Sequence, residues 1–382
     1  MKFLHLSDLH IGKSVNSFSM LEEQQHVFRQ IIGYIQTERP AAVIIAGDVY
    51  DRAVPGIEAV RVFDNFLTEL AHEGVAVLLI SGNHDSPERL SYASRLLTDK
   101  QLFLCGAFDG CIRNIILTDE YGEVSFWLLP FIKPSSVRGL FSEREIESYG
   151  DALAAVIETA DIDYAGRNIL VSHQFFTKTG ETSIRSDSEL NPVGGLDAID
   201  AGYIERFDYV ALGHLHGSQK VGAEHIRYAG SPLKYSFSEI RHTKSVMLVE
   251  LNEKGNMTTS ALPLAPLHDM REIKGEIAKL ISDEVSSLAD KEDYLRVVLT
   301  DEEEIIDPMG KIRSVYPNVM ALDFENSRTR VDISEINPDS EQAVQLSPYD
   351  LFSEFYLDVS GSVMSEEQAR IVRELLGSEA ME

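Results

Sequence analysis

Cysteine, long apolar runs and basic residues are all scarce in this chain of 382 residues. The two cysteines, Cys105 and Cys111, lack the CxxC spacing of a zinc site or redox pair, and we expect both to be reduced packing residues. No apolar run reaches the roughly 18 residues of a membrane span, and Asp8 interrupts the N-terminal segment before a signal-type apolar stretch can develop. These absences predict an unsecreted cytoplasmic protein that does not associate with membranes.

Basic residues are outnumbered by acidic ones. Lysine and arginine total 34 and aspartate and glutamate total 62, which gives a formal net charge of −28. Because non-specific DNA binding depends on protein cations that displace counterions from phosphate, this balance counts against a simple nucleic-acid-binding protein. Any nucleic-acid function must therefore depend on local positive charge, from clustered basic residues, metal ions or a basic partner.

The first 265 or so residues alternate short apolar runs with helical patterns. The runs at 43–46 and 75–80 are typical of strands buried on both faces. Apolar residues recur at helical spacing in two stretches, namely Phe28, Ile31, Ile32 and Ile35, and then Val60, Phe63, Leu67 and Leu70. Strands that alternate with helices predict an α/β domain with a partly parallel sheet, and the hairpin-like stretch 102–129 indicates a second sheet.

Two prolines at 263 and 266 follow a predicted strand at 245–251 and mark a domain boundary. We therefore expect a main domain over 1–265 and a small α/β cap over 266–336. Within the cap, the pattern predicts a helix at 273–288, a strand at 294–299, a helix at 308–315 and a strand at 319–324. The remaining 337–382 is predicted to be a linker and a helical tail, with helix starts at Ser347 and at Ser365, the latter in a capping box.

Metal-ligand residue types follow five of the apolar strand-like runs. Because the carboxyl ends of parallel strands gather at one edge of a sheet, we expect these side chains to converge. The candidates are Asp8, His10, Asp48, Asn83, His173, His214 and His216.

The chemistry of this set favours a transition metal. Two carboxylates, one amide and four imidazoles without a thiolate suit manganese, iron or zinc and fit a calcium site poorly. Seven ligands are too many for one catalytic metal and about right for two metals that share a bridging carboxylate. Gly47, Gly82 and Gly213 precede the ligands at points where the backbone must turn or be approached closely.

Some neighbouring residues leave alternatives open. Asp85 could be a ligand, an orienting group or part of the N-cap of the helix that begins after Ser86, and we favour the N-cap. The histidines that fit no ligand pattern are interpreted as structural or solvent-facing, namely His5, His26, His72, His225, His242 and His268.

The order and spacing of the motifs D-x-H, G-D-x-x-D, G-N-H-D, a lone histidine and G-H-x-H resemble those of the calcineurin-like metallophosphoesterases. Within that superfamily the chain is similar to the SbcD family of double-strand-break repair nuclease subunits. The opening sequence 3–12 and the segments 228–232 and 236–239 carry this narrower resemblance. The resemblance implies a sandwich of two mixed sheets flanked by helices, with a small α/β cap domain and a C-terminal helical tail.

The resemblance also assigns roles to individual residues. It implies one metal held by Asp8, His10 and His216, a second held by Asn83, His173 and His214, and a bridge at Asp48. His84 would stand over the reacting phosphate, and the carboxylate of Asp51 would orient His84. Both ions are most often Mn²⁺ in the family.

Partner contacts follow from the same resemblance. Four basic residues near the motifs could meet DNA phosphates or simply be solvated, namely Lys13, Arg52, Arg89 and Lys178. The family uses its tail to grip the coiled-coil base of an SbcC-type, SMC-like ATPase. The tail residues expected to make that contact are Leu351, Phe352, Phe355, Ile371 and Leu375.

The leading hypothesis is a metal-dependent DNA nuclease with exonuclease activity and endonuclease activity on hairpins and single strands. The family implies a homodimer within a heterotetramer with the ATPase, acting in DNA repair, recombination and replication at the nucleoid. An alternative is a small-molecule phosphodiesterase or protein phosphatase on the same dimetal core, which the acidic charge favours and the additional residues after Pro266 disfavour. A third hypothesis is an end-binding scaffold whose metals are structural.

Overall fold

The chain forms two compact units, Met1–Met270 and Arg271–Glu382. The computed structural model describes residues 1–178, 186–189, 197–327, 349, 352–353, 355–357 and 361–378. The division between the units lies just after the predicted boundary at 263–266. The three-part division into 1–265, 266–336 and 337–382 stays a prediction.

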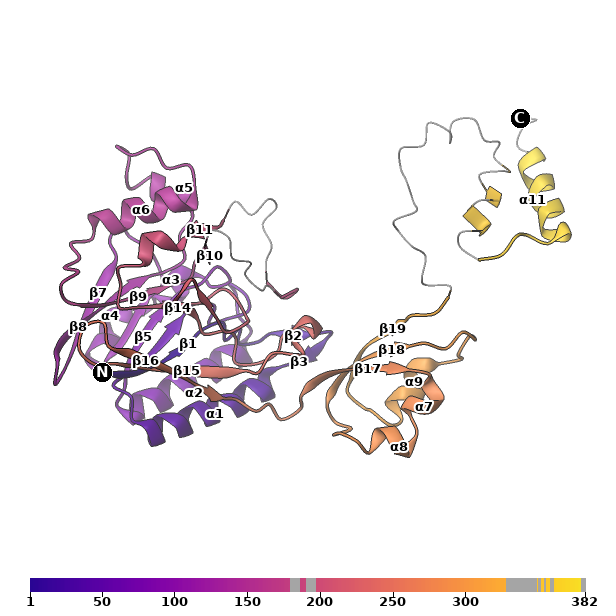
Figure 1. The fold of residues 1–382 in the computed structure, drawn as a ribbon, viewed down its shortest axis with the longest axis horizontal. Coiled ribbons are helices and arrows are strands. Elements are labelled where there is room, and N and C mark those ends of the chain that lie inside the picture. Colours follow the sequence, from indigo (N-terminus) through magenta and orange to yellow (C-terminus); the bar gives the residue numbers. More distant parts are fainter. Residues whose placement is uncertain are drawn as a thin grey trace. The chain divides into compact units, whose positions relative to one another are not determined.

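Two six-stranded mixed sheets build the first unit (Figure 1). The first sheet contains, in spatial order, β16 (Met257–Pro263), β15 (Ser245–Leu251), β1 (Lys2–Leu6), β4 (Ala42–Ala46), β5 (Ala76–Ile80) and β6 (Leu102–Cys105). The second contains β13 (Gln219–Val221), β14 (Ala223–Tyr228), β12 (Tyr209–Leu212), β9 (Arg167–Ser172), β8 (Gly122–Leu129) and β7 (Arg113–Asp119).

Each sheet has a parallel part and antiparallel strands at an edge, on one side of the first sheet and on both sides of the second. Strands β1, β4, β5 and β6 run parallel, as do β8, β9, β12 and β14. The antiparallel neighbours are β15 and β16 in the first sheet, and β13 and β7 in the second. The expected architecture of two mixed sheets is confirmed, and the predicted strands at 43–46, 75–80 and 245–251 are present.

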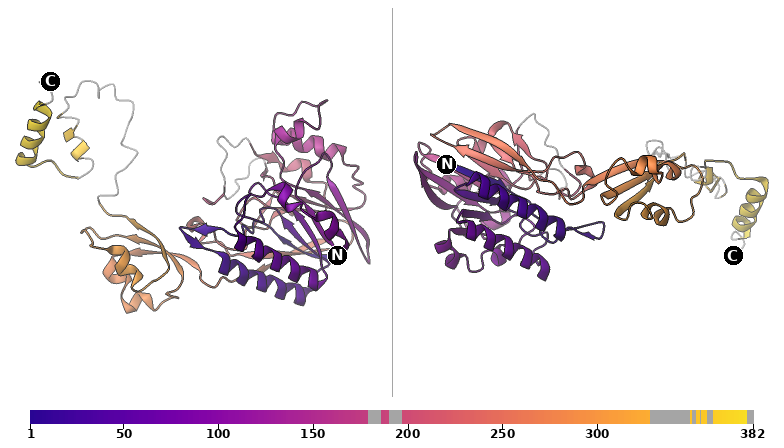
Figure 2. Two further views of the ribbon diagram at one scale, coloured as in Figure 1. Left: turned by 180° about the vertical axis from the view of Figure 1, so that it is seen from behind. Right: turned by 90° about the horizontal axis from the view of Figure 1, so that it is seen from below.

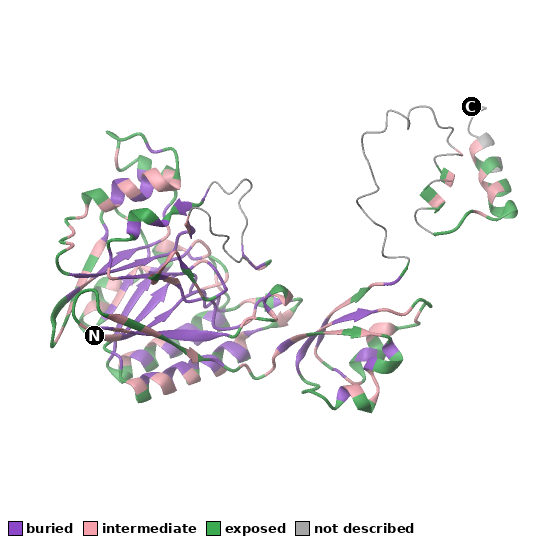
Figure 3. Cartoon of the chain, viewed as in Figure 1, coloured by how far each residue is buried: buried purple, intermediate pink, exposed green. Residues whose placement is uncertain are grey.

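The two sheets pack face to face around an apolar core. Phe3, Ile44 and Leu78 of the first sheet share one buried cluster with Phe126 and Tyr209 of the second. All five are fully buried. Runs of aliphatic residues on successive positions form these strands because both of their faces are covered, and Figure 3 shows the central strands as buried along their length.

Helices α1 (Leu21–Glu38) and α2 (Ile57–Glu73) lie side by side along the outer face of the first sheet (Figure 2). Phe28 of α1 stacks on Phe66 of α2, with ring centroids 4.4 Å apart. The predicted apolar face of α1 is confirmed, but that of α2 is rotated. Val60 is 44% exposed, and Ala59, Val62, Phe63, Phe66 and Leu70 form the buried face.

The outer face of the second sheet is covered mainly by α6 (Tyr149–Thr159), whose residues Leu153 and Val156 join its core cluster. The remaining elements of this unit are short. They are β2 (Ser14–Val15), β3 (Phe18–Ser19), α3 (Pro87–Leu90), α4 (Ser94–Leu97), η1 (Thr98–Lys100), α5 (Pro134–Arg138), β10 (Phe176–Thr177), β11 (Ile199–Asp200), η3 (Ala201–Ile204) and η4 (Phe237–Glu239).

A three-stranded sheet in the order β17-β18-β19 forms the core of the second unit. Its strands are β17 (Met270–Gly275), β18 (Tyr294–Leu299) and β19 (Val319–Phe324), and its helices are α7 (Ile277–Leu280), α8 (Asp283–Ser286) and α9 (Pro308–Arg313). The predicted strands at 294–299 and 319–324 and the helix near 308–315 are present. The single helix predicted at 273–288 is wrong, because Ile273 lies in β17 and two one-turn helices follow it.

The tail contains α11 (Glu366–Ser378). Its predicted capping box is present, since Gln368 Oε1 accepts from the Ser365 amide at 2.8 Å and Ser365 Oγ accepts from the Gln368 amide at 3.3 Å. The other predicted helix start, at Ser347, lies outside the described residues. Among the described residues, no helix is long and apolar enough to cross a membrane. Both cysteines are free thiols, but Cys111 is exposed and therefore is not a packing residue.

Candidate dimetal centre

All seven predicted ligands lie in loops at the carboxyl ends of parallel strands. Asp8 and His10 follow β1, Asp48 follows β4 and Asn83 follows β5, all in the first sheet. The other three come from the second sheet, where His173 follows β9, and His214 and His216 follow β12. The site therefore lies where two stacked sheets present the same edge. Asp8, His10, Asp48, His173 and His216 are buried, and Asn83 and His214 are half-buried.

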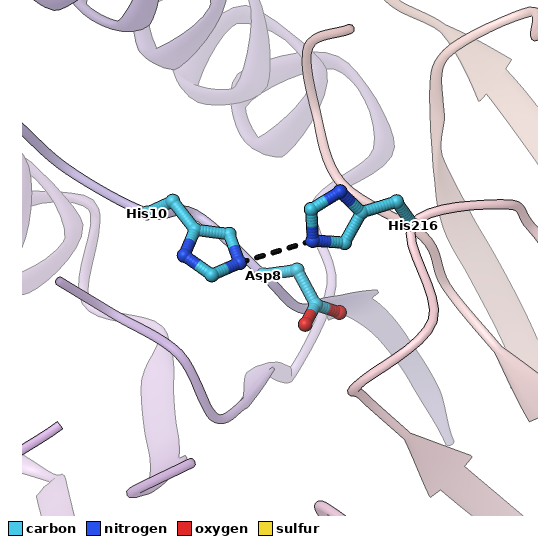
Figure 4. A group of neighbouring side chains, drawn as sticks. All are labelled: Asp8, His10 and His216. Carbon is cyan, nitrogen blue, oxygen red and sulfur yellow. Dashed lines mark hydrogen bonds between the residues drawn. The ribbon is translucent and has the colours of Figure 1, made fainter. Parts of the chain in front are cut away.

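Asp8, His10 and His216 form the first cluster (Figure 4). The Nε2 atoms of His10 and His216 are 3.1 Å apart, and the Asp8 carboxylate lies beside them. The Nδ1 atom of His216 contacts Ser188 Oγ and Glu239 Oε1, which act as acceptors because Ser188 donates its own proton to Glu239. His216 therefore carries its proton on Nδ1 and turns the lone pair of Nε2 toward His10.

His173 is the centre of the second cluster. Its Nδ1 donates to the Ala46 carbonyl at 2.7 Å, because a carbonyl can only accept. The opposite nitrogen, Nε2, lies 3.2 Å from both Asn83 Oδ1 and Asp48 Oδ2. The same Asn83 oxygen is 3.1 Å from Nδ1 of His214. Several acceptor atoms thus converge on one point.

These donor atoms fit divalent cations. The lone pairs of two imidazoles face each other in the first cluster, and an imidazole lone pair faces oxygens in the second, so each cluster needs a positive charge between its members. His10 Nδ1 is buried without a hydrogen-bond partner, which leaves that ring free to place its proton there and keep Nε2 as a ligand. Mixed nitrogen and oxygen donors suit manganese, iron or zinc. Asp48 belongs to two of the possible clusters, as a bridging carboxylate would.

The pKa values show the same need for positive charge. Burial opposes the charged form of His173, but the charge and hydrogen bond of Asp48 outweigh it and raise the His173 pKa to about 9. Burial would raise the pKa of Asp48, yet His173 holds it well below its usual range. Burial lowers the pKa of His10 and raises that of Asp8. In the free chain, a proton on His173 therefore balances the carboxylate.

Four of the ligand residues adopt a left-handed backbone, with φ of 52° at Asp8, 44° at His10, 49° at Asp48 and 110° at His214. Such conformations cost about 1–3 kcal/mol each in non-glycine residues and persist only where the surroundings hold them. Strain concentrated on these residues is typical of a functional site. It turns the side chains out of the strand direction and into the common point.

The predicted glycines are required by close approaches. A Cβ on Gly47 would lie 2.3 Å from His173 Nδ1, and one on Gly82 would lie 2.1 Å from Asp48 Oδ1. A Cβ on Gly213 would lie 2.0 Å from the Ala46 carbonyl oxygen. The loops of the two sheets therefore touch at this point. The glycines therefore let the ligand loops pack directly on one another.

His84 lies at the edge of the clusters, half-buried and within reach of His10 and Asp48. Its amide donates to Asp48 Oδ1 at 2.9 Å. Its Nδ1 donates to Asp51 at 2.9 Å, but to the main-chain carbonyl rather than to the carboxylate we expected. The Asp51 carboxylate instead pairs with Lys13 at 2.8 Å. Asp51 therefore orients His84 through its backbone, which leaves Nε2 of His84 directed away from this contact.

Asp85 was considered from the sequence, but the role favoured for it was the wrong one of the three. Its buried carboxylate accepts from the amides of Val49, Tyr50 and Gly82 at 2.9–3.0 Å, so it ties the β4 loop to the β5 loop. Ser86, the N-cap residue of α3, makes no side-chain cap hydrogen bond, and the N-cap role favoured for Asp85 is wrong. The G-N-H-D motif contained the signal, since its last residue is an acid in a loop that must be held in place.

Glu239 and Lys244 were missed by the sequence interpretation. Glu239 is fully buried, with Oε2 2.6 Å from Lys244 Nζ and Oε1 3.1 Å from His216 Nδ1. Lys244 also donates to the His216 carbonyl at 2.9 Å. The segment 236–239, which the sequence linked only to the family resemblance, thus supplies the carboxylate that fixes the His216 ring.

The residues predicted to contact DNA or a protein partner differ in exposure and in ion pairing. Arg89 is exposed, and Arg52 is 80% exposed although its Nε lies 3.6 Å from Asp51 Oδ2. Lys13 also pairs with Asp51, and Lys178 pairs with Glu205. In the tail, Phe352, Phe355, Ile371 and Leu375 are 39–64% exposed, and Leu351 lies outside the described residues. None of these residues lies in the clusters described above.

Comparison with known proteins gives two family matches. Residues 1–218 match the family described as calcineurin-like phosphoesterase. Residues 266–360 match the SbcD C-terminal family, described as type 5 capsule protein repressor C-terminal domain. The SbcD subunit of the nuclease SbcCD from Staphylococcus epidermidis is 32% identical over 383 aligned positions, which cover 98% of each chain.

Solved structures resemble the chain more remotely. The phosphopantetheinyl hydrolase of Mycobacterium tuberculosis aligns with a TM-score of 0.39 and 15% identity over 63% of this chain and 92% of its own. A dimetal phosphatase of Danio rerio aligns with a TM-score of 0.39 and 13% identity over 69% of this chain and 96% of its own. At these scores neither structure carries an argument about function.

The calcineurin-like match extends over more than half of the chain, and the identity to the staphylococcal protein extends over nearly all of it. Both agree with the sandwich of two mixed sheets and with the acid, amide and imidazole clusters at its edge. The chain is a phosphoesterase that belongs to the calcineurin-like metallophosphoesterase family and, within it, to the SbcD group.

Proposed function

We propose that this chain is a metal-dependent DNA nuclease, the catalytic subunit of an SbcCD-type complex that processes DNA ends and hairpins. The observation that carries the proposal is the convergence of seven candidate ligands from five strand ends on one edge of the sandwich. The near full-length identity to a protein named as a nuclease subunit supports DNA as the substrate.

The geometry supports a division of the ligands between two ions. Asp8, His10 and His216 would hold one, Asn83, His173 and His214 the other, and Asp48 would bridge them. Two bound divalent ions, for which we propose Mn²⁺, supply Lewis acidity toward the phosphodiester and lower the pKa of a bound water. The roles of individual ligands rest on their placement and on the family resemblance.

His84 is the proposed catalytic residue outside the metal ligands. The Asp51 carbonyl holds its Nδ1 proton, so Nε2 is the nitrogen available to a phosphate at the site. A protonated Nε2 could stabilise charge on the phosphate or donate a proton to the leaving oxygen. The half-buried position of His84 gives it access to a bound strand, which the fully buried His173 lacks.

The rest of the chain would serve substrates and partners. We propose that Arg52 and Arg89 contact DNA phosphates, and that Lys13 and Lys178 join them if their ion pairs open. The exposed apolar residues of the tail would bind an SbcC-type ATPase, and the subunit would act as a homodimer within a heterotetramer at the nucleoid. The second unit would act as a cap domain.

A cleavage assay tests the proposal directly. Purified protein with Mn²⁺ is expected to degrade linear duplex DNA and to open DNA hairpins. His84→Gln should lower the rate by about 10²-fold or more, because general acid–base groups contribute about 10²–10⁴-fold. Asp48→Asn should also lower the rate, because it removes the proposed bridging carboxylate. Undiminished cleavage by either variant would contradict the assigned role.

The alternative substrates belong in the same assay. A cyclic nucleotide and a phosphopeptide test the phosphodiesterase and phosphatase alternatives, and faster turnover of either than of DNA would displace the nuclease proposal. DNA binding that survives chelation, without cleavage under any metal, would favour the scaffold hypothesis.

A further inference from the structure

Two polar residues, Glu23 and Gln24, lie on the buried face of helix α1. Gln24 is fully buried, and the other buried residues on this face are mostly apolar, among them Val27, Phe28 and Ile31. A buried amide is costly unless its donors and acceptor are satisfied. Helix packing alone would favour an aliphatic side chain here, so the amide must serve its polar neighbours.

Every hydrogen bond of the Gln24 amide is directed at the metal-ligand loop after β1 or at Tyr235. Its Nε2 donates to the His10 carbonyl at 2.8 Å and to the Leu9 carbonyl at 3.3 Å. Its Oε1 accepts from the Gly12 amide at 3.1 Å. Gln24 thus binds the loop on both sides of the ligand His10.

Tyr235, from a distant part of the sequence, contacts both Gln24 and the same loop. Its hydroxyl donates to the Leu9 carbonyl at 2.6 Å and accepts from Gln24 Nε2 at 3.0 Å. The edge of its ring faces both imidazoles of the first cluster, with centroids 5.7 Å from His10 and 5.9 Å from His216. The Tyr235 side chain is buried, so this contact is shielded from water.

The loop that these two residues hold is strained. His10 has φ 44°, and the alternative extended backbone would turn its ring away from His216. On the other side, the His10 amide donates to the Asp48 carbonyl at 2.9 Å, which connects the loop to the neighbouring ligand. The Lys13 amide also donates to the His10 carbonyl at 3.0 Å, and the side-chain bonds to the Leu9 and His10 carbonyls come from Gln24 and Tyr235.

We propose that Gln24 and Tyr235 are a positioning pair that holds His10 in its ligand conformation and so sets the affinity of the Asp8, His10 and His216 site for a divalent metal. The inference rests on the metal sites of the proposed function. Neither residue touches the metal. Loss of such outer partners elsewhere lowers metal affinity by about 10–100-fold, which is the effect expected here.

Direct Mn²⁺ binding to the full chain, followed by the EPR signal of free Mn²⁺, tests the inference without DNA or cleavage. The native chain should bind two ions. Gln24→Leu should weaken one of them by about 10–100-fold and leave the other near its native affinity. The matched control is Gln25→Leu, because Gln25 is exposed on the same helix and should bind both ions normally.

Two further variants separate positioning from general destabilisation. Ile31→Ala empties a fully buried site on the same helix face without touching the loop and should keep both affinities. Tyr235→Phe keeps the ring and removes only the hydroxyl, so it should fold, weaken the same site by several-fold and add little to Gln24→Leu in the double variant.

The outcomes are distinct. Native affinity in Gln24→Leu or Tyr235→Phe, or an equal loss in Ile31→Ala, overturns the positioning role. A native chain that binds no Mn²⁺ overturns the metal site and the inference together, whereas two native sites with unaffected variants overturn only the inference.

Discussion

Lys244→Met should destabilise the first unit strongly, because it breaks a buried ion pair. The side chains of Lys244 and Glu239 are 6% and 0% exposed, and Nζ lies 2.6 Å from Oε2. Removing one partner of a buried pair costs about 3–5 kcal/mol, since the other charge remains buried. Glu239 keeps hydrogen bonds from Ser186, Ser188 and His216, so we expect the lower part of this range, about 3–4 kcal/mol.

The single tryptophan provides the assay. Trp127 is buried in β8 and donates to Asn168 Oδ1 at 2.8 Å, so its fluorescence reports the first unit and not the second. Measured in chelator, the midpoint of its thermal transition should fall by about 6–16 °C, at about 2–4 °C per kcal/mol for a unit of this size. Lys220→Met is the control, because its ion pair with Glu224 is exposed to solvent and should contribute little to stability.

A second variant checks the reason for the loss. Glu239→Gln combined with Lys244→Met removes the unpaired charge and keeps an acceptor for Ser188. The double variant should therefore be more stable than Lys244→Met alone by about 1–2 kcal/mol. If Lys244→Met unfolds within about 1 kcal/mol of the native chain, or if the double variant is no more stable than the single one, the buried charge is not what the pair neutralises.

Three further predictions concern the site and its scaffold. Gly82→Ala would place a Cβ 2.1 Å from Asp48 Oδ1 and should lower phosphodiester hydrolysis by about 10²-fold, whereas Gly56→Ala, which meets no atom within 4 Å, should leave it unchanged. Saturating Mn²⁺ should raise the midpoint of the thermal transition of Trp127 fluorescence above its value in chelator. At a Mn²⁺ concentration 100 times the dissociation constant, the bound ion adds about 2.7 kcal/mol of stability. Hydrogen bonds from Arg167 hold the pKa of Asp119 well below 3.8. The native chain should therefore exceed an Asp119→Asn variant in stability by a constant amount above pH 3.8, and this difference should shrink as the pH falls below 3.8. Urea unfolding of both proteins at each pH measures the difference.

Each of these has an outcome that would contradict it. Normal activity in Gly82→Ala would mean that the β5 loop can move away from Asp48 at little cost. An unchanged midpoint with Mn²⁺ would mean that the folded chain binds the ion no better than the unfolded chain. A constant gap between native and Asp119→Asn proteins from about pH 6 to about pH 2.5 would mean that the Asp119 pKa is not depressed.

Short-range patterns predicted the parts of the molecule that depend on short-range physics. Strands β4, β5, β15, β18 and β19 could be located because aliphatic residues on successive positions need two covered faces. The ligands could be found because each lies within a few residues of a strand end, where the topology of a parallel sheet directs it. The helix α2 was placed correctly, but its buried face was not, because Val60 and Val62 are equally apolar and only the packing against α1 and the sheet selects Val62.

Long-range contacts account for what was missed. Gln24 and Glu239 each reach a ligand loop from a distant segment, and Asp85 lies in one ligand loop but binds another, the loop after β4. Sequence spacing does not show which loop each side chain reaches. The predicted helix at 273–288 failed for a related reason. Ile273 has helical spacing to Ile277 and Leu280, yet pairing of β17 with β18 extends the backbone there.

If the chain acts on DNA as proposed, its distribution of charge makes metal binding a condition of DNA binding. Its net charge of −28 repels phosphate, and three of its four candidate DNA contacts are in ion pairs, Lys13 and Arg52 with Asp51 and Lys178 with Glu205. The carboxylates of Asp8 and Asp48 lie at the proposed phosphate site, and in the free chain a proton on His173 offsets part of their charge. Cations at the clusters therefore both complete the ligand geometry and reverse the local field, and a basic partner surface would have to supply the remaining attraction along the DNA.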